Sequence, residues 1–214
     1  MGLRVVQGAV INPLPEFGNV CPVNPSLCTQ GLTVSVFIKV ITLDSVQPHP
    51  YDDDRPYDFD LPYDDDRKYK FLFGNIDKDL RHIKDYYGFA VGVKGSSFEI
   101  NVNSKNYVCS SSWASITGYL WSHLVFTWKD PELPDGGLEI FVDSKKVSPA
   151  LSWLYDDCSR QTRDRTLLRH LKIGFNDDDL SVTAEFDHLA IWYQKLQAND
   201  SILTAPWVHV RGNV

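Results

Sequence analysis

The feature that most constrains this fold is a pair of alternating segments near the middle of the chain. Residues 121–128 read Trp-Ser-His-Leu-Val-Phe-Thr-Trp, and residues 137–142 read Gly-Leu-Glu-Ile-Phe-Val. Apolar side chains recur at every second position, and successive side chains of a β-strand point to opposite faces. Each segment is therefore predicted to be a strand with one apolar face. Residues 129–136 contain two prolines and a glycine, which predicts that the strands form a hairpin.

Similar strand signals recur along the chain, with turn residues between them. They lie at residues 32–40, 70–73, 89–93, 98–102, 171–175 and 186–193. No long amphipathic helix is indicated, although a short helical turn is expected near 198–203. This spacing predicts an all-β fold, an antiparallel β-sandwich. A chain of 214 residues fits one such domain, so we expect a single domain spanning 1–214.

The net charge of −7 comes from one short segment. Residues 51–66 hold eight aspartates and one arginine, so the rest of the chain is balanced. No basic surface is indicated, which argues against a nucleic-acid partner or an anionic membrane surface. No run of eighteen apolar residues is present, so direct membrane insertion is not expected.

An acidic, tyrosine-rich insertion is expected at about 45–70. The sequence Pro-Tyr-Asp-Asp-Asp-Arg occurs at 50–55 and again at 62–67. Proline and like charges disfavour a packed strand, so the segment is predicted to be a loop. Three interpretations of this loop stay open. It is a solvated insertion, a cation site that uses the aspartate carboxylates, or a protein-contact loop, for which aromatic rings and charges together are suited. The candidate partner-binding residues are Tyr51, Tyr57, Tyr63, Asp52 and Asp64.

The four cysteines predict two disulfides, Cys21–Cys28 and Cys109–Cys158, with free thiols as the alternative. The spacing and the lack of nearby histidines do not support zinc. Disulfides indicate an extracellular location, either secreted or in the ectodomain of a cell-surface protein. The Asn199-Asp-Ser sequon predicts glycosylation at Asn199. Because the N-terminus lacks the apolar region of a signal peptide, the chain is expected to be a processed piece or an excised domain.

Three segments resemble the laminin-G-like and pentraxin-like domains of the concanavalin-like jelly-roll superfamily. They are residues 30–39, the hairpin 121–143 and residues 184–200. Phe37 stands where tryptophan is common in the family, and His188 replaces a common glutamate. The pattern Cys21…Cys28-Thr-Gln-Gly is similar to the pentraxin-like domain at the extracellular end of some adhesion G-protein-coupled receptors. The resemblance implies a jelly-roll sandwich of the laminin-G/pentraxin type and says little about function.

The beginning of the chain departs from the family pattern. Family members start with a strand that precedes the segment in which this chain begins, so the first strand is expected to be missing here. An unpaired sheet edge invites a strand from another chain. The sequence therefore raises the hypothesis that an adjacent chain, or an upstream part of the same protein, completes the sandwich.

Relatives of this type often bind calcium at one rim of the sandwich, and this resemblance implies a candidate calcium site. Asn176, Asp177 and Asp178 follow a predicted strand and are the candidate ligands, with a solvated turn as the alternative. Trp121 and Trp128 are expected to fill or edge the core. His123, on the face opposite Leu124, is interpreted as a structural histidine.

Other relatives are glycoside hydrolases that carry Glu-x-Asp-x-x-Glu on one strand. Here Glu185 and Asp187 match the first two positions, but Ala190 occupies the third. Two carboxyl groups with different roles are needed for that chemistry. No nucleophile elbow, metal-binding histidine motif or phosphate-binding loop is present. We therefore expect no enzymatic activity. The leading function is a noncatalytic extracellular recognition or adhesion module for a protein or glycan. The alternatives are a structural subunit of an extracellular assembly or filament and, less well supported, a jelly-roll glycoside hydrolase.

Overall fold

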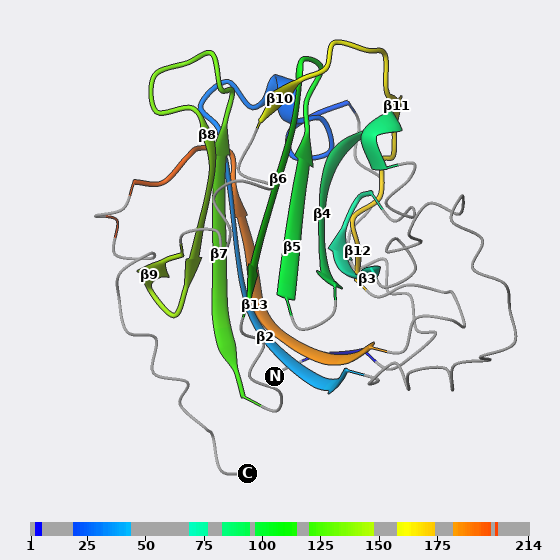
Figure 1. Cartoon of the computed structure of the whole chain (residues 1–214), viewed down its shortest axis with the longest axis vertical. Coiled ribbons are helices and arrows are strands. Elements are labelled where there is room, and N and C mark those ends of the chain that lie inside the picture. Colours follow the sequence, from blue (N-terminus) through cyan, green and yellow to red (C-terminus); the bar gives the residue numbers. More distant parts are fainter. Residues whose placement is uncertain are drawn as a thin grey trace, which may run out of the picture.

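The computed structural model describes residues 3–5, 19–43, 69–76, 83–94, 97–114, 120–147, 158–173, 182–197 and 200. Within these residues, two β-sheets face each other and form a sandwich, as Figure 1 shows. The prediction of an all-β antiparallel sandwich is confirmed.

The first sheet contains six strands in the order β1-β13-β2-β7-β8-β9, all paired antiparallel. Their bounds are Leu3–Val5 for β1, Val182–Trp192 for β13, Leu32–Leu43 for β2, Ser122–Lys129 for β7, Gly137–Val142 for β8 and Lys145–Lys146 for β9. The long strands β2 and β13 run side by side and curve together at one end of the molecule (Figure 1).

The second sheet contains seven strands, six of them in the order β10-β6-β5-β4-β3-β12, and β11 pairs in parallel with β4. Their bounds are Ser159–Arg160 for β10, Tyr107–Ala114 for β6, Ser97–Asn103 for β5, Tyr86–Lys94 for β4, Tyr69–Gly74 for β3, Lys172–Ile173 for β12 and Thr166–Leu167 for β11. Two short 3₁₀ turns, η1 at Pro25–Leu27 and η3 at Ile83–Asp85, lie between strands.

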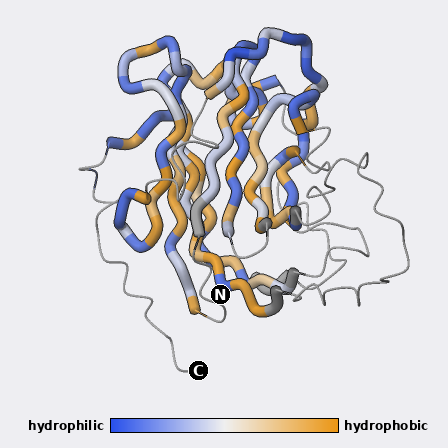
Figure 2. Tube along the Cα trace, viewed as in Figure 1, coloured by the Kyte–Doolittle hydropathy of each residue, from blue (hydrophilic) through white to orange (hydrophobic). Residues whose placement is uncertain are grey.

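The core lies between the sheets, where the alternating apolar residues of the strands meet. Along β2, every second side chain from Leu32 to Val40 is at most 2% exposed. Aromatic rings join the two layers, since Phe89 of β4 lies 5.5 Å from Phe126 of β7 between ring centroids. Hydrophobic and hydrophilic positions alternate along the strands in Figure 2. The predicted period of two therefore describes how the sandwich buries its apolar side chains.

Strand β7 departs from the simple hairpin expectation, because both of its faces are buried. Leu124, Phe126 and Trp128 point into the main core as predicted. On the other face, Val125 packs against Phe141 and Leu196. The reason is that the segment after β13 returns over this face. Its Leu196 amide donates to Thr33 Oγ1 (3.0 Å), and that hydroxyl donates to the Gln194 carbonyl (2.7 Å).

The edge beside β13 is occupied by this chain itself. Residues 3–5 form β1, which pairs antiparallel with Ala184–Phe186 of β13. The expectation of a missing first strand gave rise to the hypothesis that an adjacent chain completes the sheet. The pairing of residues 3–5 with β13 gives that hypothesis no support, and it stays a prediction.

Both predicted disulfides are present. Cys21 and Cys28 close a short loop that contains η1, and Asn24 caps η1 by accepting from the Ser26 amide (3.2 Å). Cys109 of β6 pairs with Cys158, which directly precedes β10. The second bridge therefore links two segments that are 49 residues apart in the chain.

Candidate functional site

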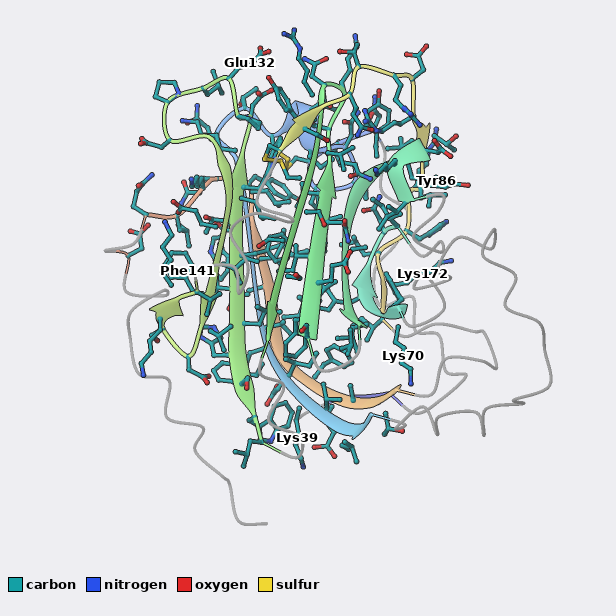
Figure 3. All side chains as sticks on the ribbon, in the orientation of Figure 1. Lys39, Lys70, Tyr86, Glu132, Phe141 and Lys172 are labelled. Atoms are coloured by element: carbon teal, nitrogen blue, oxygen red, sulfur yellow. A yellow bond between two sulfur atoms is a disulfide. The ribbon has the colours of Figure 1, made fainter. Side chains whose placement is uncertain are left out.

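The outer face of β13, β2 and β7 carries a group of aromatic and charged side chains. Directly paired residues of neighbouring strands share one face of a sheet. The register pairs Phe37 with both Asp187 and His123. It also pairs Lys39 with Glu185, and the Lys39 ammonium lies 6.0 Å from the centroid of the Trp121 ring. We name as the aromatic–charged face the residues Phe37, Lys39, Trp121, Glu185, Asp187 and His188. Lys39 is labelled in Figure 3, at the end of the molecule where β2 curves.

A buried histidine, His123 of β7, packs against Phe37 of this face. His123 is 4% exposed, and its ring stacks on Phe37 with centroids 4.6 Å apart and planes at 19°. Its Nε2 forms a 2.7 Å hydrogen bond with Ser35 Oγ. Burial lowers the pKa of His123, against a smaller opposing effect of the Asp143 charge. The neutral ring therefore holds Phe37 in place, which fits the structural role inferred from the sequence.

The two carboxylates on this face are each held by a nearby cation or hydrogen-bond donor. Glu185 Oε2 accepts from Lys39 Nζ at 3.1 Å, and both side chains are about one quarter exposed (24% and 25%). Asp187 Oδ1 accepts from the His188 backbone amide (2.9 Å) and lies 3.1 Å from His188 Nδ1. The His188 side chain is 71% exposed, whereas Asp187 is 11% exposed. The face thus presents fixed polar groups beside partly exposed aromatic rings.

A β-bulge determines which residues follow Asp187 on this face. The register between β13 and β2 shifts between Asp187 and Ala190, and His188 has a positive φ of 50°. After the bulge Ala190 pairs with Ser35, which lies on the same face as Phe37. Glu185, Asp187 and Ala190 therefore do share one face, as the Glu-x-Asp-x-x motif requires. A methyl group occupies the third position, so this motif does not supply the second catalytic carboxyl group.

A concave feature lies elsewhere in the molecule, between β6 and the loop that joins β7 to β8. It is a cavity of about 270 Å³. Tyr107 of β6 bridges to this loop by donating to Glu132 Oε1 at 3.0 Å, and the Arg160 guanidinium lies 3.5 Å from the same oxygen. Glu132 is labelled in Figure 3, close to the yellow disulfide at this end of the molecule. The cavity is lined by Cys109, Ser110, Pro131, Gly136, Gly137, Leu138 and Cys158.

Several residues singled out by sequence lie outside the described part of the chain. They are the candidate calcium ligands Asn176, Asp177 and Asp178, the glycosylation site Asn199, and the loop residues Tyr51, Asp52, Tyr57, Tyr63 and Asp64. Among the residues that the structure does describe, no group of three or more His, Cys, Asp or Glu side chains could hold a metal ion.

The two tryptophans at the two ends of β7, Trp121 and Trp128, have different environments. Trp128 is fully buried in the core, as expected, whereas Trp121 is partly exposed beside Lys39. The sequence reasoning did not identify Phe37 and Lys39 as surface candidates. Strand alternation places them opposite the apolar residues of β2, but their position next to Glu185 and Asp187 depends on the pairing of β2 with β13.

No family model matches the chain, and no curated protein sequence matches it. Among solved structures, a carbohydrate-binding module (CBM40) of a Ruminococcus gnavus IT-sialidase bound to α2,3-sialyllactose is 10% identical, with a TM-score of 0.54 and 94% of each chain covered. The binding domain of botulinum neurotoxin DC in complex with rat synaptotagmin II is 10% identical, with a TM-score of 0.53. The receptor-binding domain of botulinum neurotoxin type G is 11% identical, with a TM-score of 0.51.

These similarities show the fold alone. The chain is covered to 94% and 92% in the two neurotoxin comparisons, but it spans only 45% and 44% of those binding domains. The neighbours agree with a jelly-roll-like sandwich. They do not single out the laminin-G or pentraxin type that the sequence resembles.

Proposed function

We propose that this chain is a noncatalytic recognition module of an extracellular protein, and that it binds a glycan through the aromatic–charged face. The observation that carries the proposal is that the two carboxylates of this face are fixed by Lys39 and His188 beside partly exposed rings. Fixed charged groups form strong hydrogen bonds with hydroxyl groups, and aromatic rings cover apolar surface. Ala190 at the third motif position favours binding over hydrolysis.

Two other observations support this proposal. The two disulfides are typical of proteins in oxidising, extracellular compartments. Two of the solved neighbours are bound to ligands, one to sialyllactose and the other to synaptotagmin II. A protein partner is therefore the alternative to a glycan. Within the described residues, no helix is long and apolar enough to span a membrane.

Replacing Lys39 with Met is expected to weaken glycan binding by a factor of about 10 to about 100, because a hydrogen bond to a charged group contributes about 1.5–3 kcal/mol. A glycan array would first identify the ligand, and calorimetry would then compare the variants. Lys146→Met is the matched control, because Lys146 also pairs with a glutamate in the same sheet, at 3.0 Å from Glu139. Lys146→Met should keep its thermal stability, since the Lys146 side chain is 58% exposed and exposed ion pairs contribute little, and thermal unfolding of both variants checks that each is folded. Equal losses in the two variants, or no glycan bound by the parent chain, would contradict the glycan proposal.

We also propose a calcium site at Asn176, Asp177 and Asp178, and a partner-contact role for the tyrosine–aspartate loop. Both proposals rest on the sequence. Calcium titration by calorimetry is expected to give a binding heat that the Asp177→Ala/Asp178→Ala double variant loses, because carboxylate oxygens are preferred calcium ligands. Asp52→Ala/Asp64→Ala serves as the matched control and should retain the heat. If the parent chain gives no calcium-dependent heat, the calcium site is wrong.

A further inference from the structure

The two disulfides of this chain differ in their access to solvent. Cys21 and Cys28 are 8% and 4% exposed and belong to the core. In the second bridge, Cys109 is only 1% exposed, whereas Cys158 is half-buried at the margin of the core. Both sulfur-bearing residues of this second bridge also line the cavity of about 270 Å³. A small molecule that enters the cavity can therefore reach the disulfide from the Cys158 side.

The two sulfur atoms of the second bridge also differ in their hydrogen bonds. The indole Nε1 of Trp128 donates to Cys109 Sγ at 3.4 Å, and Trp128 is fully buried. A donor aimed at a sulfur stabilises its thiolate form, and the Trp128 indole is in place to do this for Cys109. In thiol–disulfide exchange, the entering thiolate attacks the sulfur that it can reach, and the other sulfur leaves. Because Cys109 is buried and Cys158 is partly exposed, Cys158 is the sulfur that is attacked and Cys109 is the one that leaves.

We propose that Cys158 is a site of S-thiolation by a low-molecular-weight monothiol, with Cys109 as the leaving group. The thiolate of the small molecule attacks Cys158 Sγ and forms a new S–S bond there. The Cys109–Cys158 bond breaks, and Cys109 departs with the electron pair as a thiolate that accepts the hydrogen bond from Trp128. One disulfide is exchanged for another, so no external oxidant is needed. A second thiolate that attacks the mixed disulfide releases Cys158 as a free thiolate.

This exchange changes how one edge of the second sheet is held. Without the bridge, β10 is joined to β6 by the pairing of Ser159 and Arg160 with Val108 and Tyr107, and the Gln161 amide donates to the Asn106 carbonyl at 2.8 Å. The ion pair of Arg160 with Glu132 also spans this region, but both side chains are at least half exposed (69% and 50%). Exposed pairs of this kind contribute little to stability. S-thiolation at Cys158 therefore loosens the segment that forms one wall of the cavity.

Glutathione is the probe that tests this proposal. The folded chain is incubated with reduced glutathione without denaturant, quenched with N-ethylmaleimide and mapped by peptide mass spectrometry over time. Glutathione is expected on Cys158 and the maleimide on Cys109, while the Cys21–Cys28 bridge remains intact for at least about ten times longer because exchange depends on access. Glutathione on Cys109, or equal rates for the two bridges, would overturn the proposal. The two bridges would exchange at equal rates if glutathione reacted only with the globally unfolded chain.

A pair of core variants separates the role of the indole donor from general destabilisation. Trp128→Phe removes the N–H group and is expected to slow exchange at Cys158 about tenfold relative to the parent chain, because the leaving thiolate loses its donor. Phe126→Leu weakens the same core and keeps the indole donor of Trp128, so it should not slow the exchange. A faster reaction of Trp128→Phe, shared by both bridges, would show that Trp128 acts only through stability and would overturn the assigned leaving group.

Discussion

Removing the Cys109–Cys158 disulfide should lower the free energy of unfolding by about 4 kcal/mol, whereas removing Cys21–Cys28 should cost about 2 kcal/mol. The difference follows from the sequence separations of 49 and 7 residues. A cross-link restricts the unfolded chain, and the entropy it removes grows with the logarithm of the closed loop, which gives about 4 and about 2 kcal/mol. Urea unfolding of the Cys109→Ala/Cys158→Ala and Cys21→Ala/Cys28→Ala variants measures both values.

The slope of each urea transition serves as the internal control. When a disulfide is removed, the loop that it closed is released and exposes more surface in the unfolded state. The m-value should therefore rise more for the variant that lacks the Cys109–Cys158 disulfide, which closes the longer loop. The parent chain under the same conditions gives the reference. Equal stability losses for the two variants would contradict the loop-entropy explanation, and would indicate that local packing around each bridge dominates.

The sequence predicted those strands in which the side chains that point into the core differ in polarity from the side chains on the opposite face. In β2 and β5, apolar residues at every second position produce the pattern directly. Strand β6 was not predicted, because Ser110, Ser111 and Ser112 give it no apolar alternation. It forms because β5 and β10 pair with it on either side and because Cys109 is cross-linked. These causes are long-range, and a local pattern does not contain them.

The candidate site depends on contacts that are even further apart in the chain. Lys39 and Glu185 are 146 residues apart, and only the register of β2 with β13 brings them to 3.1 Å. The sequence did identify Glu185, Asp187 and Ala190 as members of one motif. It could not show that a bulge after Asp187 returns Ala190 to the same face. The chemistry of individual residues was thus readable, whereas their grouping into a surface required the fold.

Arg165 illustrates a stabilising residue with no signature in the sequence. Its side chain is directed into the molecule, the residue is 8% exposed, and its guanidinium donates to four backbone carbonyl groups. These belong to η3, to the turn between β5 and β6, and to the segment before β11. Burial lowers the pKa of Arg165, yet its ordinary value is so high that the group stays charged. The acceptors are the carbonyl oxygens of Lys84, Ser104, Lys105 and Gln161.

Arg165→Met is therefore expected to cost at least about 3 kcal/mol of unfolding free energy, because hydrogen bonds from a charged donor are lost and partly buried carbonyls lose their partner. Arg163→Met is the matched control two residues away. Its guanidinium pairs with Asp85 at 2.7 Å, but both side chains are about half exposed (49% and 51%), so the loss should stay below about 1 kcal/mol. Arg165→Lys should recover only part of the stability, since one ammonium cannot reach all three segments. Urea unfolding of the three variants decides the question. If Arg163→Met and Arg165→Met lose the same stability, the guanidinium of Arg165 is not what joins these segments.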